Sequence, residues 1–289
     1  MKTSSKFHFF SLVFVLIGFV SCLPDEKNVP IRNSEDLKEE TITDFYFQDL
    51  DDLSGVALAA PAADQYTGGR GQTTITIEDH RFGCEGIIIS IEPGVNSTTE
   101  NPNGVLTVNF GSSGCKDLKG NIRKGKVMFT YTGKRFMPNS TVVTTLEDYM
   151  INNIKLEGVI TSTNVASSTE DAPEFNVVLT DGKAIFGDGS VAKRESDITW
   201  SWLRAENPLN DKLVVHAGSI ASGETRNGTV YHVTVSDQME YQRSCAIAVA
   251  GIKTYTLNKG AEIIIDFGEG SCDRVVTVSA GESEHTVML

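Results

Sequence analysis

Apolar and polar residues alternate through much of the chain beyond residue 72, and this two-residue period constrains the fold more than any other feature. Runs such as residues 73–77, 127–131 and 231–235 are rich in the β-branched and aromatic residues that favour strands. Turn sequences, such as Asp181-Gly182, separate the runs. No helical pattern interrupts them, so antiparallel pairing is expected. The sequence predicts a mainly β fold, an antiparallel meander of hairpins with roughly 14 strands, and leaves sandwich, barrel and elongated sheet open.

The first 22 residues have the pattern of an export signal that ends in a lipidated cysteine. Two lysines precede an uncharged apolar run, residues 9–20, and Ser21 stands directly before Cys22. An ordinary signal peptidase site would place the bulky Phe19 where a small residue is needed. The apolar run is also shorter than the roughly 20 residues that span a bilayer. We therefore expect the mature protein to begin at a diacylglyceryl-modified Cys22, which anchors it in a membrane.

The other four cysteines belong to an internal repeat. The segment that ends at Cys115 reads VNFGSSGC, and the segment that ends at Cys272 reads IDFGEGSC. Cys84 and Cys245 each open a β-rich run, and a turn sequence lies midway between the members of each pair. We predict the disulfides Cys84–Cys115 and Cys245–Cys272, each closing the open end of a hairpin and stabilising the fold by about 3 to 4 kcal/mol. Zinc is the alternative, but C-x-x-C spacing is absent, and we predict no metal.

One helix is predicted ahead of the β region, with Ser34 as its N-cap. Apolar residues recur there at three- and four-residue spacing, at Ile42, Phe45, Tyr46, Leu50, Leu53, Val56 and Ala57. We expect this face to pack on the β region, although a partner protein is the alternative. Asp49, Asp51 and Asp52 superficially suggest a calcium loop, but Leu53 stands where an oxygen ligand is needed. We interpret the three aspartates as a solvated helix face.

The chain therefore divides into four segments. They are a signal peptide (1–21), a tether (22–33), a helix with its linker (34–71) and a β region (72–289) whose hairpins repeat over about 80–165 and 166–289. The net charge is −13 at pH 7, which argues against a nucleic-acid partner and against electrostatic docking on anionic lipid. The membrane partner is reached through Cys22 instead.

The lipobox, the acidic helix and the paired F-G-x-x-x-C hairpins, together with the segments KGNIRKGK, YTG and TWSW, resemble a group of uncharacterised exported lipoproteins abundant in Bacteroidetes. The resemblance implies an all-β lipoprotein of the outer membrane or cell surface. It implies no activity and no cofactor, so no functional residue is carried over. Acidic residues soon after the lipidated cysteine accompany surface display in that group, and Asp25 and Glu26 fit this pattern, with Pro24 as a departure.

Catalytic motifs are scarce. The chain has no G-x-S-x-G and no H-E-x-x-H. Ser190 and Lys193 match S-x-x-K, but they follow a predicted turn between strands, and we interpret the match as chance. His216 and His232 could face each other across a hairpin centred near Glu224 and hold a metal. We favour two neutral histidines on a sheet surface, and we predict no catalytic residues.

The one candidate binding site is Trp200, Trp202 and Arg204. Alternate residues of a strand share a face, so the two indoles form either a sugar-stacking platform or part of the core. The function that the sequence favours is a membrane-anchored binding or adhesion module for a glycan or protein ligand, at the outer membrane and either surface-exposed or periplasmic. The alternatives are a structural or assembly component of the envelope and a hydrolase with paired carboxylates about 5 to 9 Å apart.

Overall fold

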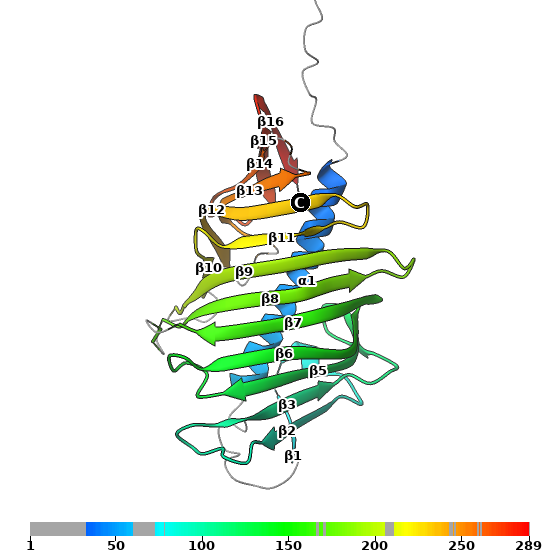
Figure 1. Cartoon of the computed structure of the whole chain (residues 1–289), viewed down its shortest axis with the longest axis vertical. Helices are drawn as coiled ribbons and strands as arrows, with labels where there is room; N and C mark the ends of the chain where they lie inside the picture. Colours follow the sequence, from blue (N-terminus) through cyan, green and yellow to red (C-terminus); the bar gives the residue numbers. More distant parts are fainter. Residues whose placement is uncertain are drawn as a thin grey trace, which may run out of the picture.

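The computed structural model describes residues 33–59, 73–77, 79–165, 168–169, 172–205, 211–242, 245, 247–258, 260 and 262–288. Within these residues, sixteen strands form one antiparallel sheet, and a long helix runs across the strands on one side of it (Figure 1). The predicted fold class, a mainly β antiparallel meander with one N-terminal helix, is confirmed. The signal segment, residues 22–32 of the tether with Cys22, and the linker at 60–71 lie outside the described residues. The helix begins at Asn33, so Ser34 lies within it and the prediction that Ser34 is the N-cap is wrong.

Most strands pair with their neighbours in the sequence. The order across the sheet is β1-β2-β3-β5-β6-β7-β8-β9-β10-β12-β13-β14-β15-β16, with β4 beside β5 and β11 between β9 and β12. The elements are α1 (Asn33–Ala59), β1 (Thr73–Ile75), η1 (His80–Phe82), β2 (Ile88–Pro93), β3 (Asn103–Asn109), β4 (Cys115–Lys116), β5 (Ile122–Thr132), β6 (Thr141–Ile151), β7 (Ile154–Asn164), β8 (Glu174–Ile185), β9 (Val191–Leu203), β10 (Lys212–Val215), β11 (Ile220–Glu224), β12 (Val230–Gln242), β13 (Ala250–Leu257), β14 (Glu262–Glu269), β15 (Val275–Ala280) and β16 (Ser283–Met288).

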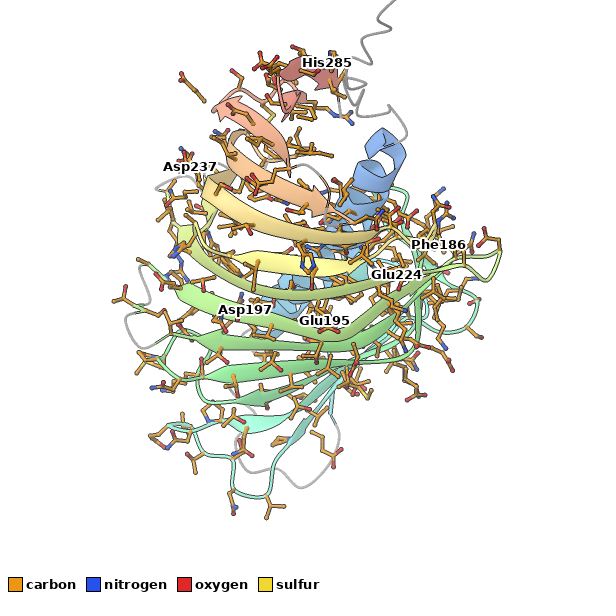
Figure 2. The ribbon with its side chains drawn as sticks, turned by 45° about the horizontal axis from the view of Figure 1, so that its top comes forward. Phe186, Glu195, Asp197, Glu224, Asp237 and His285 are labelled. Carbon is orange, nitrogen blue, oxygen red and sulfur yellow. A yellow bond between two sulfur atoms is a disulfide. The ribbon has the colours of Figure 1, made fainter. Side chains whose placement is uncertain are left out.

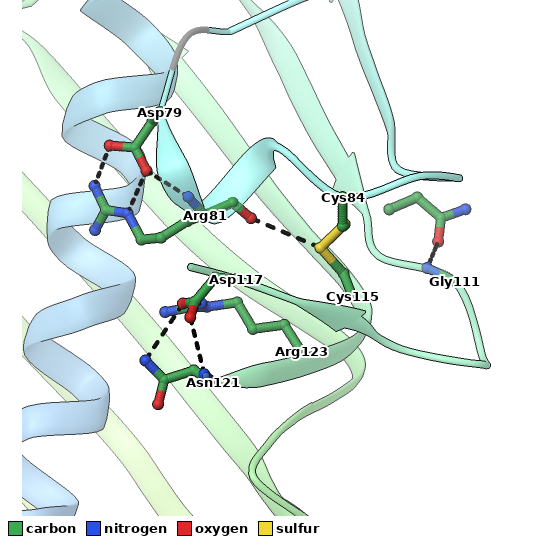
Figure 3. Close-up of a disulfide and its surroundings, with 9 residues drawn as sticks. Asp79, Arg81, Cys84, Gly111, Cys115, Asp117, Asn121 and Arg123 are labelled. Atoms are coloured by element: carbon green, nitrogen blue, oxygen red, sulfur yellow. Dashed lines mark hydrogen bonds and ion pairs between the residues drawn. A yellow bond between two sulfur atoms is a disulfide. The ribbon is translucent and has the colours of Figure 1, made fainter. Parts of the chain in front are cut away.

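Both predicted disulfides are present. Cys84 pairs with Cys115 at the open end of the β2–β3 hairpin, and Cys245 pairs with Cys272 at the open end of the β13–β14 hairpin. The Cα atoms are 5.5 Å apart in each pair, which is the usual span of a disulfide. Figure 3 shows the first pair together with Arg81, Asp117 and Arg123, which lie between it and α1.

Two glycines allow strands to bend where the register shifts. Gly158 in β7 and Gly251 in β13 have φ of 130° and 103°, and each lies at a β-bulge. A Cβ at Gly158 would press on the backbone of Gly182, and one at Gly251 on the backbone of Gln238. Bulges at these positions increase the local twist of the sheet.

The two faces of the sheet differ in polarity. The face of the sheet that meets α1 carries side chains such as Val127 and Phe129, which are fully buried in the core that the helix and the sheet form together. The outer face is polar, and Figure 2 shows Glu195, Asp197 and Glu224 projecting from it. This alternation is the arrangement expected of an antiparallel sheet with one covered face.

The helix buries most of the predicted face, including Leu50, Leu53 and Ala57, but leaves two of the predicted positions exposed. Ile42 and Phe45 are 47% and 50% exposed, whereas the buried apolar positions are Phe47, Leu50, Leu53, Ala57 and Leu58. Polar side chains fill the rest of the buried stripe, including Glu40 and Asp44. The expected stripe counted only apolar residues, so it was rotated away from the acids that the helix in fact buries.

Buried ion pairs attach the first half of α1 to the sheet. Arg194 of β9 donates to Glu40 and to Asp44, at 2.5 Å in each case. Lys253 of β13 lies 3.3 Å from Asp44, and the Tyr255 hydroxyl donates to Glu40 at 2.9 Å. Burial alone lowers the pKa of Arg194, but attraction to Asp44 and Glu40 outweighs it and raises the pKa above its usual value.

A second set of ion pairs lies near the middle of the helix. Arg123 of β5 donates to Asp49 at 2.8 Å and pairs with Asp117. Arg81 of η1 donates to Asp52 at 2.6 Å. The prediction that the helix aspartates form a solvated face is therefore wrong for Asp49, whose side chain is 11% exposed. Asp52 is exposed but still bonded, because the sheet and η1 present arginines to this part of the helix.

Removing the charge of Arg194 should destabilise the protein strongly. In the variant Arg194→Met, Glu40 and Asp44 lose their guanidinium partner while buried, and we expect a loss of about 3 to 5 kcal/mol in the free energy of unfolding, measured by urea denaturation.

Lys193→Met is the matched control, because Lys193 pairs with Glu224 on the outer face, with side chains 59% and 40% exposed. A loss of about 0 to 1 kcal/mol is expected there. Equal losses in the two variants would contradict the role of the buried pairs.

Candidate functional site

A cavity of about 160 Å³ lies between α1 and strands β6 to β10. An apolar cavity of about 150 Å³ is large enough to hold benzene. Two of the lining residues, Asp52 and Leu213, are exposed, so the cavity reaches the protein surface. Protein interiors are otherwise packed with few voids of this size, and this space is therefore our candidate site.

The sheet forms the floor of the cavity through side chains that lie opposite each other on neighbouring strands. Because strand residues alternate between faces, every second position of β7, β8 and β9 contributes. The three rows are Val142–Ser162–Val177–Ile198, then Ile160–Leu179–Ser196, and then Phe175–Trp200–Val215.

The helix forms the roof through residues three, four or seven positions apart, which lie on one side of a helix. They are Asp44, Phe47, Gln48, Asp51, Ser54, Gly55 and Leu58. Most of the surface that the floor and the roof present to the cavity is apolar or aromatic, so the few polar groups stand out.

Asp51 is a perturbed acid of the cavity. Burial, together with the charge of the neighbouring Asp52, raises the pKa of Asp51 to about 6. The positive charge of Arg135 and hydrogen bonding by Trp200 and Ser162 oppose this rise without cancelling it. Asp51 therefore changes its charge close to neutral pH, which is unusual for a carboxyl group.

Arg135, from the β5–β6 connection, is a perturbed base of the cavity. Burial, with a smaller effect of the nearby Arg204, lowers the pKa of Arg135 to about 10, although Asp51 and Asp52 act in the opposite direction. Its guanidinium donates to the carbonyl of Gly55 on α1. Among the ion pairs of the described residues, none joins Arg135 to Asp51.

The predicted site residues lie at and beside this cavity. Trp200 lines it, and its ring centroid is 4.8 Å from that of Phe175. Trp202 and Arg204 lie next to it, with the guanidinium carbon of Arg204 4.8 Å from the Trp202 ring. The shared face of the two tryptophans is confirmed by the register, which places Trp200 opposite Val215 and Trp202 opposite Leu213. Both indoles are half-buried.

Arg135 and Phe136 complete the site, and sequence reasoning missed them. The guanidinium carbons of Arg135 and Arg204 lie 4.8 and 4.7 Å from the centroid of the Phe136 ring, and Phe136 also packs on Trp202. The β5–β6, β7–β8 and β9–β10 connections all lie at the same end of the strands, which brings these residues together. No local motif marks Arg135, since its partners are distant in the sequence.

The histidine pair is not formed. The β11–β12 hairpin turns at residues 225–229, so His232 lies opposite Ser222, and the alternative in which it faces His216 is excluded. His216 Nε2 instead lies 2.6 Å from Ser201 Oγ. Glu174 approaches the same Nε2 atom, at 3.9 Å, whereas a catalytic triad needs the acid at Nδ1. Within the described residues no group of three potential metal ligands is found.

The S-x-x-K match has a structural explanation. Ser190 ends the turn between β8 and β9, as predicted, and its hydroxyl bonds to Asp188. Lys193 lies on β9 and pairs with Glu224. The two side chains of the motif are therefore occupied by other partners.

Asp51 should make the stability of the protein depend on pH. A carboxyl whose pKa is raised on folding holds its proton where the unfolded chain has lost it, so the free energy of unfolding falls as pH rises from about 4 to 6, by at most about 3 kcal/mol. Asp51→Asn should therefore stabilise the protein above pH 6, with a gain that shrinks towards pH 4. Urea denaturation at pH 4, 5, 6 and 7 measures it.

Asp188→Asn is the control, because Asp188 should make the free energy of unfolding depend on pH in the opposite direction. Hydrogen bonds from Ser190 lower the pKa of Asp188, so its contribution to stability is lost as pH falls. A gain from Asp51→Asn that is the same at every pH would contradict the assignment.

Comparison of the chain with known protein families, with curated proteins and with solved structures found no match. No helix among the described residues is long and apolar enough to cross a membrane.

Proposed function

We propose that this protein is a binding protein, and that its ligand places a compact apolar group in the cavity between α1 and strands β6 to β10. The observation that carries the proposal is the cavity itself, with aromatic side chains from both walls and a few polar groups. Small-molecule sites in proteins have this composition, in which apolar surface supplies affinity and isolated polar groups supply orientation.

The ion pairs of α1 explain why the cavity persists. Glu40 and Asp44 bond to Arg194 and Lys253 on one side of the cavity, and Asp49 bonds to Arg123 on another. These ion pairs fix the distance between the helix and the sheet. The helix therefore cannot settle onto the floor to fill the space without breaking buried charge pairs, which is costly.

The chemistry of the described residues favours binding over catalysis. Asp44 is held by Arg194 and Lys253, so it is not free to act beside Asp51 as the second acid of a carboxylate hydrolase. Ser201 and His216 lie on the outer face of the sheet, and Glu174 is placed to compete for the serine proton. Asp51 then acts as an orienting group for a ligand.

Filling the cavity should abolish binding. Val177 lies in the middle of the floor, so Val177→Phe projects a ring into the space that the ligand needs. We define four phenyl probes of matched size, namely benzoate, phenyl phosphate, benzyl alcohol and benzylamine. Isothermal titration calorimetry should detect binding of at least one probe to the natural protein, and at least a tenfold loss in Val177→Phe.

Val178→Phe is the matched control, because the next residue of the strand points to the outer face. It should bind as the natural protein does. Failure of all four probes to bind, or equal loss in both variants, would contradict a site at this cavity.

We also propose that acyl chains on Cys22 hold this binding domain at the outer membrane, on the residues of the export signal. Metabolic labelling with palmitate in a producing bacterium should mark the natural protein and not Cys22→Ala. The double variant Cys245→Ala, Cys272→Ala removes two other cysteines and should retain the label. Label in Cys22→Ala would contradict the anchor, and protease treatment of intact cells separates surface from periplasmic display.

A further inference from the structure

Two arginines beside the cavity, Arg135 and Arg204, lack the carboxylate partners that four other arginines of this protein have. Arg81, Arg123, Arg194 and Arg226 each form an ion pair with a carboxylate. Within the described residues, no carboxylate lies within ion-pair distance of either Arg135 or Arg204. The contrast is informative because the chain has an excess of acidic residues, with a net charge of −13.

One aromatic ring positions both guanidinium groups. Arg135 and Arg204 lie 4.8 and 4.7 Å from the centroid of Phe136, within the range of a cation–π contact. Phe136 is itself fixed between Phe175 and Trp202, with centroids 6.5 and 6.3 Å away. Stacking holds a guanidinium by its face and leaves N–H groups at its edge for a ligand.

The electrostatics of the pair favour an anion. Burial disfavours the charge of Arg135 and the charge of Arg204 adds to this effect, yet with a pKa of about 10 Arg135 remains a cation at neutral pH. Two adjacent cations with free N–H groups match a carboxylate or phosphate, which arginine binds with two parallel hydrogen bonds. Arg135 also lines the cavity, so an anion bound there would be next to the apolar space.

We propose that Arg135 and Arg204 bind an anionic group of the ligand, a carboxylate, sulfate or phosphate, while its apolar part occupies the cavity. This inference rests on the proposed function and adds the chemical class of the ligand, a small anionic amphiphile. The alternative class is an amine that pairs with Asp51. The other two acids of the cavity are already paired, Asp44 with Arg194 and Lys253, and Asp52 with Arg81.

The four phenyl probes test the charge of the ligand directly, because they share a ring and differ in the group attached to it. Calorimetry at pH 7 should give benzoate and phenyl phosphate at least tenfold higher affinity than benzyl alcohol, and benzylamine the lowest. Arg135→Gln and Arg204→Gln should each reduce the affinity for the two anions towards that of benzyl alcohol. Neither variant should change the affinity for benzyl alcohol.

Arg226→Gln is the matched control, since Arg226 also stacks on a phenylalanine, with 4.3 Å to the centroid of Phe186, and pairs with Glu39. Phe186 follows β8, at the end of the strands opposite to the β5–β6 connection (Figure 2). This variant should bind all probes as the natural protein does. Arg204 is exposed, so Arg204→Gln keeps the test decisive if Arg135→Gln fails to fold.

The outcomes separate the two proposals. If no probe binds, the proposed function fails, and the anionic class fails with it. If benzyl alcohol binds as tightly as benzoate, and the arginine variants bind all probes unchanged, the cavity binds ligands but the anionic class is overturned. If benzylamine binds most tightly and loses affinity in Asp51→Asn, the amine class replaces the anionic one.

Discussion

The attachment of an acidic helix to basic side chains of the sheet is the interaction on which the rest of this structure depends. Arg194 and Arg123 are almost completely buried, and each reaches two carboxylates, at least one of them on α1. Buried ion pairs add little net stability compared with apolar packing, but they tolerate few alternative arrangements. In this protein they fix which face of the helix meets the sheet, and at what distance.

The distance between α1 and the sheet connects the fold with the proposed function. The helix covers the sheet with apolar contacts at Leu50 and Leu53, which are fully buried, yet the same helix leaves a space in front of Trp200. Asp44, Asp52 and Arg194 beside the space belong to the ion-pair network. Asp51 and Arg135 also line it but form no ion pair within the described residues, and these two groups give the cavity its chemistry.

The sequence predicted the parts of this protein that depend on local pattern. The alternation within residues 127–131 and the repeat around Cys115 and Cys272 predicted strands and disulfides, because neighbours along the chain determine them. The helix and most of its buried apolar positions were predicted, but its buried acids were not, since Glu40 and Asp44 are buried by partners 150 or more residues away. Trp200 was identified by its side chain, whereas Arg135 and the cavity arise only from how α1 lies on the sheet.

The order of elements along the chain also constrains how this protein folds. The helix is made first, yet the Tyr255 partner of Glu40 lies 215 residues later and the Arg194 partner 154 residues later. Contacts between such distant segments form late, because closing a long loop costs entropy before any contact repays it. The ion pairs and hydrogen bonds of Glu40 therefore cannot form until β9 and β13 have been made. Until then, water rather than the sheet must solvate the acidic side chains of α1.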